Sequence, residues 1–221
     1  MMSEAALQTP PLAQGILGGT FDPIHFGHLH LAETARETLD LARVHFIPAG
    51  SPPHRDTPAV SAAQRLAMVR LATASNPAFS VDDHEVMSPS PSYTVITLER
   101  LRQALGASVP LVLLVGVDAF LGLPSWHQWW RLFDLAHIAV ANRPGYQLPQ
   151  MSAELQSQFN ARMAMPAALN QSPAGKIVCF DITPLSISAT QIRSLIKARR
   201  SVRYLCPDTV VDYIDTHQLY R

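Results

Sequence analysis

The sequence is poor in cysteine and in charged residues. Of its 221 residues only two are cysteine, 15% are Asp, Glu, Lys or Arg, and the formal net charge is zero. Two cysteines make no disulfide framework, and Cys179 lies in an apolar run that predicts burial, so a reducing, cytoplasmic location is expected. A neutral chain lacks the basic surface with which proteins bind nucleic acid or anionic membranes, so neither is an expected partner. The cations Lys197, Arg199, Arg200 and Arg203 form one local cluster, which predicts a solvated helix end.

Long apolar runs and the two common phosphate-binding loops are absent as well. No run approaches the ~20 consecutive apolar residues that cross a bilayer. The N-terminal segment lacks the basic start and apolar stretch of a signal peptide, and residues 1–13 are expected to be a loose lead-in. Neither Gly-x-x-x-x-Gly-Lys-Ser/Thr nor Gly-x-Gly-x-x-Gly occurs, which excludes the usual P-loop and dinucleotide fingerprints.

Short β-rich runs alternate with helix-period segments along the chain. Strands are predicted at 15–18, 43–48, 79–86, 109–115, 137–141 and 176–181, and helices at 28–39, 61–75, 95–105, after Ser188 and after Pro207. The aliphatic run 109–115 is typical of a central parallel strand that is covered on both faces. The alternation predicts an α/β fold, a doubly wound and mostly parallel sheet flanked by helices. Its proline-rich loops are too short to be linkers, so residues 1–221 are expected to form one domain.

The segment Gly18–His28 (GGTFDPIHFGH) follows a predicted strand and opens a predicted helix. Unpaired amides and the helix dipole favour anions at such a helix start. Gly18 and Gly19 allow the backbone to approach a phosphate closely. His25 and His28 are three residues apart, so both imidazoles can face the same anion. A glycine pair alone would indicate only a turn, but this combination favours phosphate binding.

The same segment resembles the (T/H)xGH signature of the nucleotidylyltransferase superfamily, with His25, Gly27 and His28 at the signature positions. The resemblance implies a Rossmann-like domain that transfers a nucleotidyl group to a phosphate without a covalent enzyme intermediate. It also implies that the two histidines hold the ATP phosphates and stabilise the transition state. Positioning and charge neutralisation are then the main tasks of the protein, because the acceptor phosphate is already a nucleophile.

A second segment, Ile187–Arg193 (ISATQIR), resembles the ISSTxxR motif of the same superfamily, with Ala189 where many members have serine. Ser188 and Gln191 also fit a capping box at a helix start. With the guanidinium of Arg193 one turn further on, this helix start makes a second anion site. The resemblance therefore implies His25, His28 and Arg193 as catalytic residues.

Further segments are similar to bacterial nicotinate-nucleotide adenylyltransferases, and in consistent order they extend the resemblance from about Gly15 to the C-terminus. They are Phe46–Pro48, Pro52–Arg55, Pro91–Thr94, Gly116–Asp118, Trp126 and Asn142–Gly145. The resemblance implies transfer of AMP from ATP to nicotinate mononucleotide, which gives deamido-NAD and pyrophosphate in NAD biosynthesis. It implies Mg²⁺ as a cofactor carried by the ATP phosphates, with no metal site formed by the protein alone.

Carried over residue by residue, the resemblance implies two binding sites. The ATP site comprises Gly18, Gly19, Thr20, Phe21, His25, Gly27, His28, Gly116, Asp118, Ile187, Ser188, Thr190 and Arg193. The mononucleotide site comprises Gly19, Thr20, His54, Arg55, Thr94, Trp126, His127 and Arg143. Trp126 is expected to stack on the pyridine ring, whereas Trp129 and Trp130, in the same expected short helix, are assigned to packing. By position alone Asp118 could instead be a helix N-cap, and His54, Arg55 and Arg143 could be ordinary loop residues.

Three alternatives remain open at this point. The acceptor could be another phosphorylated compound such as nicotinamide mononucleotide. The spacing His25-x-x-His28-x-His30 could bind zinc in a hydrolase, although a nearby cysteine or a His-Glu-x-x-His arrangement is missing. A non-catalytic nucleotide sensor could retain the fold, but the intact His25, His28, Thr190 and Arg193 argue against it. The sequence also leaves open whether the protein forms a homo-oligomer.

Overall fold

The computed structural model describes residues 11–51, 57–142, 145 and 150–221. The strands are β1 (Gln14–Gly19), β2 (Arg43–Pro48), β3 (Phe79–Val81), β4 (Leu111–Gly116), β5 (His137–Asn142) and β6 (Ile177–Asp181). They form one sheet in the order β3-β2-β1-β4-β5-β6, and all neighbouring strands pair in parallel. This is a doubly wound, Rossmann-like order whose direction of winding reverses between β1 and β4. The predicted fold class is confirmed.

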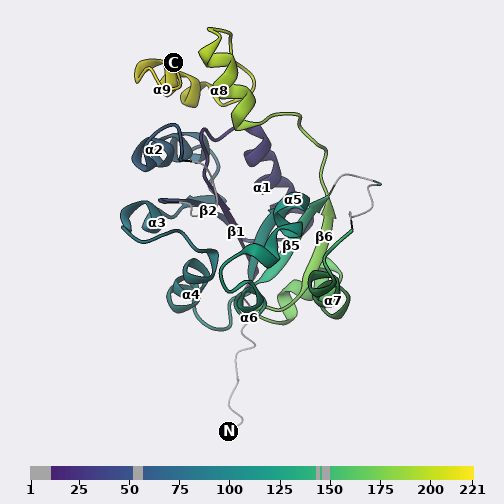
Figure 1. Cartoon of the computed structure of the whole chain (residues 1–221). Helices are drawn as coiled ribbons and strands as arrows, with labels where there is room; N and C mark the ends of the chain where they lie inside the picture. The colour runs from purple at the N-terminus through teal and green to yellow at the C-terminus, as the bar shows by residue number, and fades with distance from the viewer. Residues whose placement is uncertain (1–10, 52–56, 143–144, 146–149) are drawn as a thin grey trace.

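Helices cover both faces of the sheet (Figure 1). They are α1 (Phe26–Thr38), α2 (Ala62–Thr73), α3 (His84–Met87), α4 (Thr94–Leu105), α5 (Val117–Leu121), α6 (Leu132–Leu135), α7 (Ala153–Arg162), α8 (Ala189–Lys197) and α9 (Asp208–Thr216), with 3₁₀ turns η1 (Leu123–Ser125), η2 (Trp129–Arg131) and η3 (Pro166–Gln171). None of the helices in the described ranges is long and apolar enough to cross a membrane.

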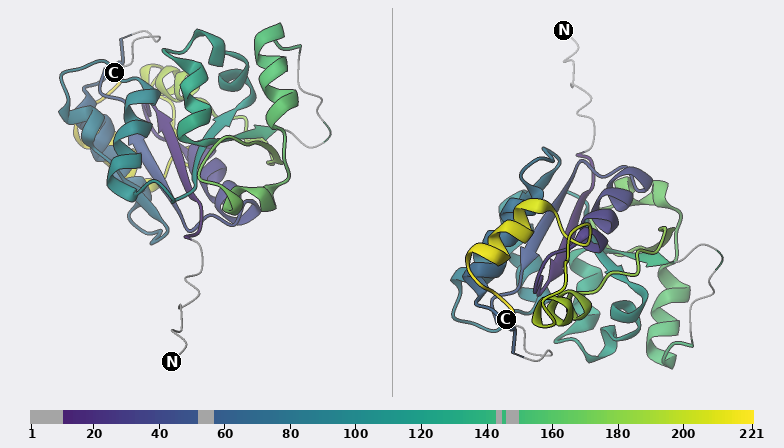
Figure 2. Two further views of the ribbon diagram at one scale, coloured as in Figure 1. Left: turned by 90° about the horizontal axis from the view of Figure 1, so that it is seen from below. Right: turned by 90° about the horizontal axis from the view of Figure 1, so that it is seen from above.

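The core has two halves because successive side chains of a strand point to opposite faces. In β4, Val112 and Leu114 pack with α1, α2, α8 and α9, whereas Leu113 and Val115 pack with α4, α5, α6 and α7. Helix α9 lies alongside α2 (Figures 1 and 2). The C-terminal helix thus packs on a helix from the first half of the chain.

The third strand is shorter than its prediction. Residues 79–86 were expected to be extended, but β3 ends at Val81 and α3 begins at His84. The carboxylate of Asp82 accepts a hydrogen bond from the backbone N–H of His84 at 3.0 Å. This Asx turn gives the backbone an alternative to strand pairing and starts the helix.

The tryptophan-rich segment is not one helix. The turns η1 and η2 are separated at Gln128, whose φ of 49° is left-handed and interrupts a continuous helix. Trp129 packs against the core as predicted, but Trp130 is 60% exposed, so its assignment to packing is wrong.

Two further burial predictions need correction. Cys179 is only half-buried, and the buried cysteine is Cys206. Ala13 was included in the loose lead-in, yet it is buried and its backbone N–H donates to Asn170 Oδ1 at 2.9 Å. The basic cluster that includes Lys197 and Arg199 is exposed at the end of α8, as predicted.

Three histidines make the stability of the fold dependent on pH: His25 and His137 are buried, and His45 is half-buried. His137 Nδ1 accepts from the Lys176 backbone at 3.0 Å and its Nε2 donates to the Ser172 carbonyl at 2.7 Å, so the ring is held neutral. Burial lowers the pKa of His25 to about 4, and it also lowers the pKa values of His45 and His137. The unfolded chain therefore binds protons at a higher pH than the folded chain does.

We expect the free energy of unfolding to fall as the pH drops below about 6.5, by up to about 1.4 kcal/mol per pH unit for each such histidine. Denaturant unfolding at pH 5 to 8 measures this slope. His137→Gln, which keeps a hydrogen-bonding side chain but does not titrate, should make the slope shallower. An unchanged slope in that variant would contradict the assignment.

Candidate active site

A cavity of about 540 Å³ opens at the carboxyl ends of β1 and β4, where the strand order reverses. Ligands bind at this point in open parallel sheets. Nine of the residues predicted from the sequence line it: Gly18, Gly19, Thr20, His28, Thr94, Gly116, Asp118, Trp126 and His127. The cavity therefore brings residues predicted for ATP together with residues predicted for the mononucleotide.

The loop after β1 is shaped by an aromatic ring beneath it. Phe21 is 2% exposed, and its ring packs edge-on against His28 with the ring centroids 5.0 Å apart. A Cβ at Gly19 would lie 3.0 Å from the Phe21 ring, so a side chain there would press against the ring. The Phe21 side chain belongs to the core, and a contact between this residue and ATP would have to come from its backbone.

The two histidines of the first motif have different environments. Their rings are stacked with centroids 3.8 Å apart, and the His25 backbone N–H donates to His28 Nδ1 at 3.3 Å. Because Nδ1 of His28 accepts, its neutral ring carries the proton on Nε2. His28 lines the cavity, whereas His25 is 6% exposed and does not line it. The structure thus places only one of the two imidazoles on the wall of the cavity.

His25 caps the start of α1 as a neutral residue. Burial lowers its pKa to about 4, and its buried Nδ1 has no hydrogen-bond partner among the described residues. A Cβ at Gly27 would lie 3.0 Å from the His25 ring, so the glycine makes room for the imidazole. His25 can therefore offer or accept a hydrogen bond, but it does not bring a positive charge to the site at pH 7.

The second motif lies beside the first, although 171 positions separate their connected residues. Arg193 Nη1 donates to the Asp22 carbonyl at 2.7 Å, and Nη2 donates to Thr190 Oγ1 at 3.3 Å. At the start of α8, Ser188 Oγ accepts from the Gln191 backbone at 3.1 Å, which is the forward half of the predicted capping box. Two helix N-termini, those of α1 and α8, therefore lie next to the same loop.

The acceptor side of the cavity is formed by the first turn of α4 and the segment after η1. Thr94 is the first residue of α4, and the first amides of a helix have no partner within the helix. Trp126 is half-buried in the cavity wall, and the ring of His127 packs 4.5 Å from the ring of Tyr93. Asp118 is the second residue of α5 and Gly116 is the N-cap, so the N-cap interpretation of Asp118 is wrong.

Several polar residues of the site gave no clear signal in the sequence. Glu85 lines the cavity and its carboxylate accepts from the hydroxyl of Thr97. Arg65 is 1% exposed and donates to the backbone of the loop after β1. Both come from segments outside the motifs, and only the folded chain brings them close.

Some predicted residues cannot be placed. His54, Arg55 and Arg143 lie outside the described residues. Within the described ranges there is no group of three or more His, Cys, Asp or Glu side chains that could hold a metal ion. The zinc hydrolase alternative, which depended on His25, His28 and His30, gains no support from this part of the chain.

Comparison with known proteins agrees with this geometry. Residues 16–195 match the family described as cytidylyltransferase-like. This chain belongs to the cytidylyltransferase-like family. A "Probable nicotinate-nucleotide adenylyltransferase" of Dechloromonas aromatica (strain RCB) is 57% identical over 210 residues, which cover 94% of this chain and 97% of the relative. A relative of the same name from Pseudomonas aeruginosa (strain UCBPP-PA14) is 48% identical over 208 residues, covering 94% and 96%. The resemblance inferred from the motifs is confirmed.

The fold is shared with a solved structure from Plasmodium falciparum, a nicotinic acid mononucleotide adenylyltransferase complexed with NaAD. The two structures superpose with a TM-score of 0.70 over 95% of this chain and 97% of the other, at 17% sequence identity. At this identity the likeness concerns the fold, and it agrees with the cytidylyltransferase-like family assigned from the sequence.

His28 is the imidazole on the cavity wall, so we expect it to contact charge that develops during the reaction. His28→Ala should lower kcat by ~10²-fold or more, the scale for loss of one transition-state contact. His30→Ala is the matched control on the same helix, because His30 does not line this cavity. Steady-state kinetics on variants that unfold like the parent protein provide the measurement. Near-normal turnover of a folded His28→Ala protein would remove His28 from the mechanism.

Proposed function

We propose that this protein transfers AMP from ATP to nicotinate mononucleotide and releases pyrophosphate, forming deamido-NAD in NAD biosynthesis. The observation that carries the proposal is the single cavity that joins the loop after β1 and His28 to Thr94 and Trp126. One wall has the features of a phosphate site and the other has a helix start and an aromatic face. Relatives with up to 57% identity carry the name of this activity.

In the proposed reaction, a phosphate oxygen of the mononucleotide attacks the α-phosphorus of ATP. A new P–O bond forms there, and the bond from the α-phosphorus to the bridging oxygen breaks, so pyrophosphate leaves with the electron pair. The start of α1, with His28 as a hydrogen-bond donor, holds the reacting phosphates. The start of α8 with Thr190 and Arg193 holds the leaving phosphates. No base is required, because the attacking phosphate is already ionised.

A divalent metal is expected with ATP, and we propose that Mg²⁺ arrives bound to the ATP phosphates and water. The donor set fits this role: Asp118 is on the cavity wall, while the described residues contain no three-residue cluster that could hold an ion alone. When bound, the ion neutralises charge on the phosphates. Asp118 would hold the ion through water or bind the ribose hydroxyls.

Two further proposals concern the whole chain. We propose that residues 1–221 form one domain, because α9 packs on α2 and α8 is bonded to the loop after β1. We propose the cytoplasm as its location, which suits two cysteines that are both free thiols.

The choice between acid and amide acceptors tests the proposal. Amides at the start of α4 can donate to a nicotinate carboxylate, whereas a nicotinamide would direct its own NH₂ at these donors. We expect kcat/KM to favour the acid by ~10² or more. Pyrophosphate release from ATP with each mononucleotide measures the ratio. Equal use of both would contradict the acceptor assignment, and no release with either would favour a nucleotide sensor.

Trp126 is expected to stack on the pyridine ring of the acceptor. Trp126→Ala should raise KM for nicotinate mononucleotide ~10-fold or more, consistent with the 1–3 kcal/mol typical of base stacking on an aromatic side chain. The affinity for ATP should hardly change. Trp130→Ala is the matched control, because Trp130 is 60% exposed and does not line the cavity. A Trp126 variant that is defective only toward ATP would refute the assignment.

A further inference from the structure

Asp22 is a buried junction between the loop after β1 and the C-terminal end of the chain. Asp22 is 7% exposed, and its backbone oxygen and both carboxylate oxygens accept hydrogen bonds. The backbone carbonyl accepts from Arg193 Nη1 at 2.7 Å, Oδ1 accepts from the Tyr220 hydroxyl at 2.8 Å, and Oδ2 accepts from the Ala59 backbone at 2.8 Å. One residue thus connects the motif arginine to the second-to-last residue of the chain.

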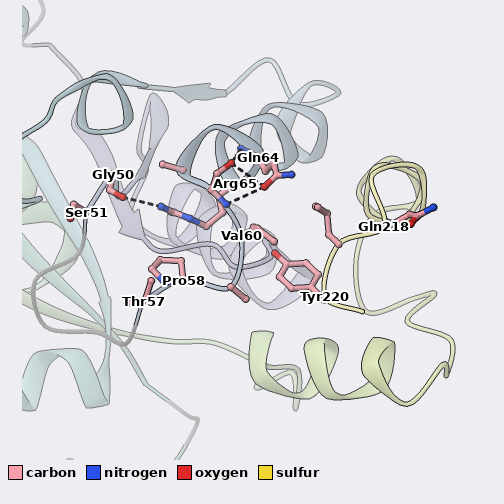
Figure 3. Close-up of a pocket in the computed structure, with 13 residues that line it drawn as sticks. Gly50, Ser51, Thr57, Pro58, Val60, Gln64, Arg65, Gln218 and Tyr220 are labelled. Atoms are coloured by element: carbon pink, nitrogen blue, oxygen red, sulfur yellow. Dashed lines mark hydrogen bonds between the residues drawn. The ribbon is translucent and has the colours of Figure 1, made fainter.

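Tyr220 reaches this junction from the segment after α9. Burial, together with the hydrogen bond to the Asp22 carboxylate, raises the pKa of the Tyr220 phenol, so the hydroxyl remains a donor at neutral pH. Tyr220 and Arg65 line a second cavity of about 680 Å³, on whose wall both are seen in Figure 3. Tyr220 thus donates to the loop after β1, although Tyr220 itself does not line the active-site cavity.

Arg65 is the other cation near the carboxylate of Asp22, and its guanidinium already donates hydrogen bonds elsewhere. Its Nη1 donates to the Thr20 carbonyl at 2.6 Å and its Nη2 donates to the Gly50 carbonyl at 3.1 Å. Burial lowers the pKa of Arg65, and the charge of Asp22 partly offsets this effect. Because two carbonyls fix its guanidinium, Arg65 is not placed to replace a hydrogen bond lost at Oδ1.

Arg193 is the cation that can respond. Its Nη1 lies 3.9 Å from Asp22 Oδ2, beyond hydrogen-bond distance, and bonds instead to the neutral carbonyl of the same residue. A buried carboxylate that loses a hydrogen-bond donor is left unsatisfied, which costs free energy unless another donor replaces it. Loss of the Tyr220 hydroxyl would therefore draw the guanidinium of Arg193 into a closer ion pair with Asp22. The positive charge of Arg193 would then be neutralised by Asp22 and would no longer be available to a ligand.

We propose that Tyr220 is a positioning residue: it satisfies the Asp22 carboxylate and so leaves the charge of Arg193 available to the phosphates of ATP. The proposal rests on the function given above, in which Arg193 contacts the leaving phosphates. It assigns a role in ATP binding to a residue near the C-terminus, 198 positions from its partner.

Tyr220→Phe removes only the hydroxyl and tests the proposal in the full-length protein. We expect KM for ATP to rise ~10-fold, within the range typical of coupling between sites, while KM for nicotinate mononucleotide stays within about twofold. Tyr213→Phe is the matched control, because Tyr213 lies on α9 and stacks on the exposed His217 with centroids 4.0 Å apart. It should leave both KM values unchanged.

A second substitution separates positioning from a structural role. Asp22→Asn keeps the backbone carbonyl that holds Arg193 but removes the charge that would attract it. The double variant Asp22→Asn/Tyr220→Phe should therefore recover most of the ATP affinity that Tyr220→Phe loses. A lower melting temperature with no selective change in KM for ATP would overturn the proposal, as would a double variant that is no better than the single one. Failure of the proposed function would appear separately, as no pyrophosphate release by the parent protein.

Discussion

The hydrogen bond from Arg193 to the backbone carbonyl of Asp22 joins the two halves of the proposed phosphate site. β6 lies at an edge of the sheet, three strands along from β1, and the chain must return from there to bring α8 beside α1 (Figure 1). At 2.7 Å this bond fixes the start of α8 against the loop after β1. Two helix N-termini aimed at one region suit a polyphosphate, because each adds unpaired amides and a favourable dipole. Without the bond, the second motif would be an ordinary capped helix.

The proposed phosphate site has no excess of positive charge. The chain is neutral overall, and burial keeps His25 neutral as well. The guanidinium of Arg65 is held by two backbone carbonyls that accept from it, and the nearby carboxylate of Asp22 offsets part of its charge. Binding therefore depends on directed donors, which are backbone amides, one imidazole and one guanidinium. Such donors discriminate by geometry, since each must lie where a particular oxygen of the ligand will be.

The layers of the fold could be predicted because they depend on local patterns, and the family resemblance added nine of the residues that line the cavity. Apolar patterns predicted all six strands, the third with its end too late, and the motif that starts at Gly18 marked the loop after β1. The turn at Asp82 was missed because a single side-chain hydrogen bond overrides the strand pattern there. Glu85 and Tyr220 were missed because their roles arise from contacts with Thr97 and Asp22, and nothing in the spacing of these residues indicates such contacts.

The proposed preference for an acidic acceptor follows from packing more than from charge. Among the described residues that line the cavity there is no Lys or Arg, and the carboxylates of Asp118 and Glu85 are present. We expect donors for a nicotinate carboxylate to come from uncharged groups on this wall, among them the backbone amides at the start of α4. The position of that helix is set by Val95, Leu98 and Leu101, which are buried against the sheet face opposite α1. In the proposed function, acceptor choice thus depends on how α4 packs on the sheet, while ATP binding depends on the loop after β1 and its bond to α8.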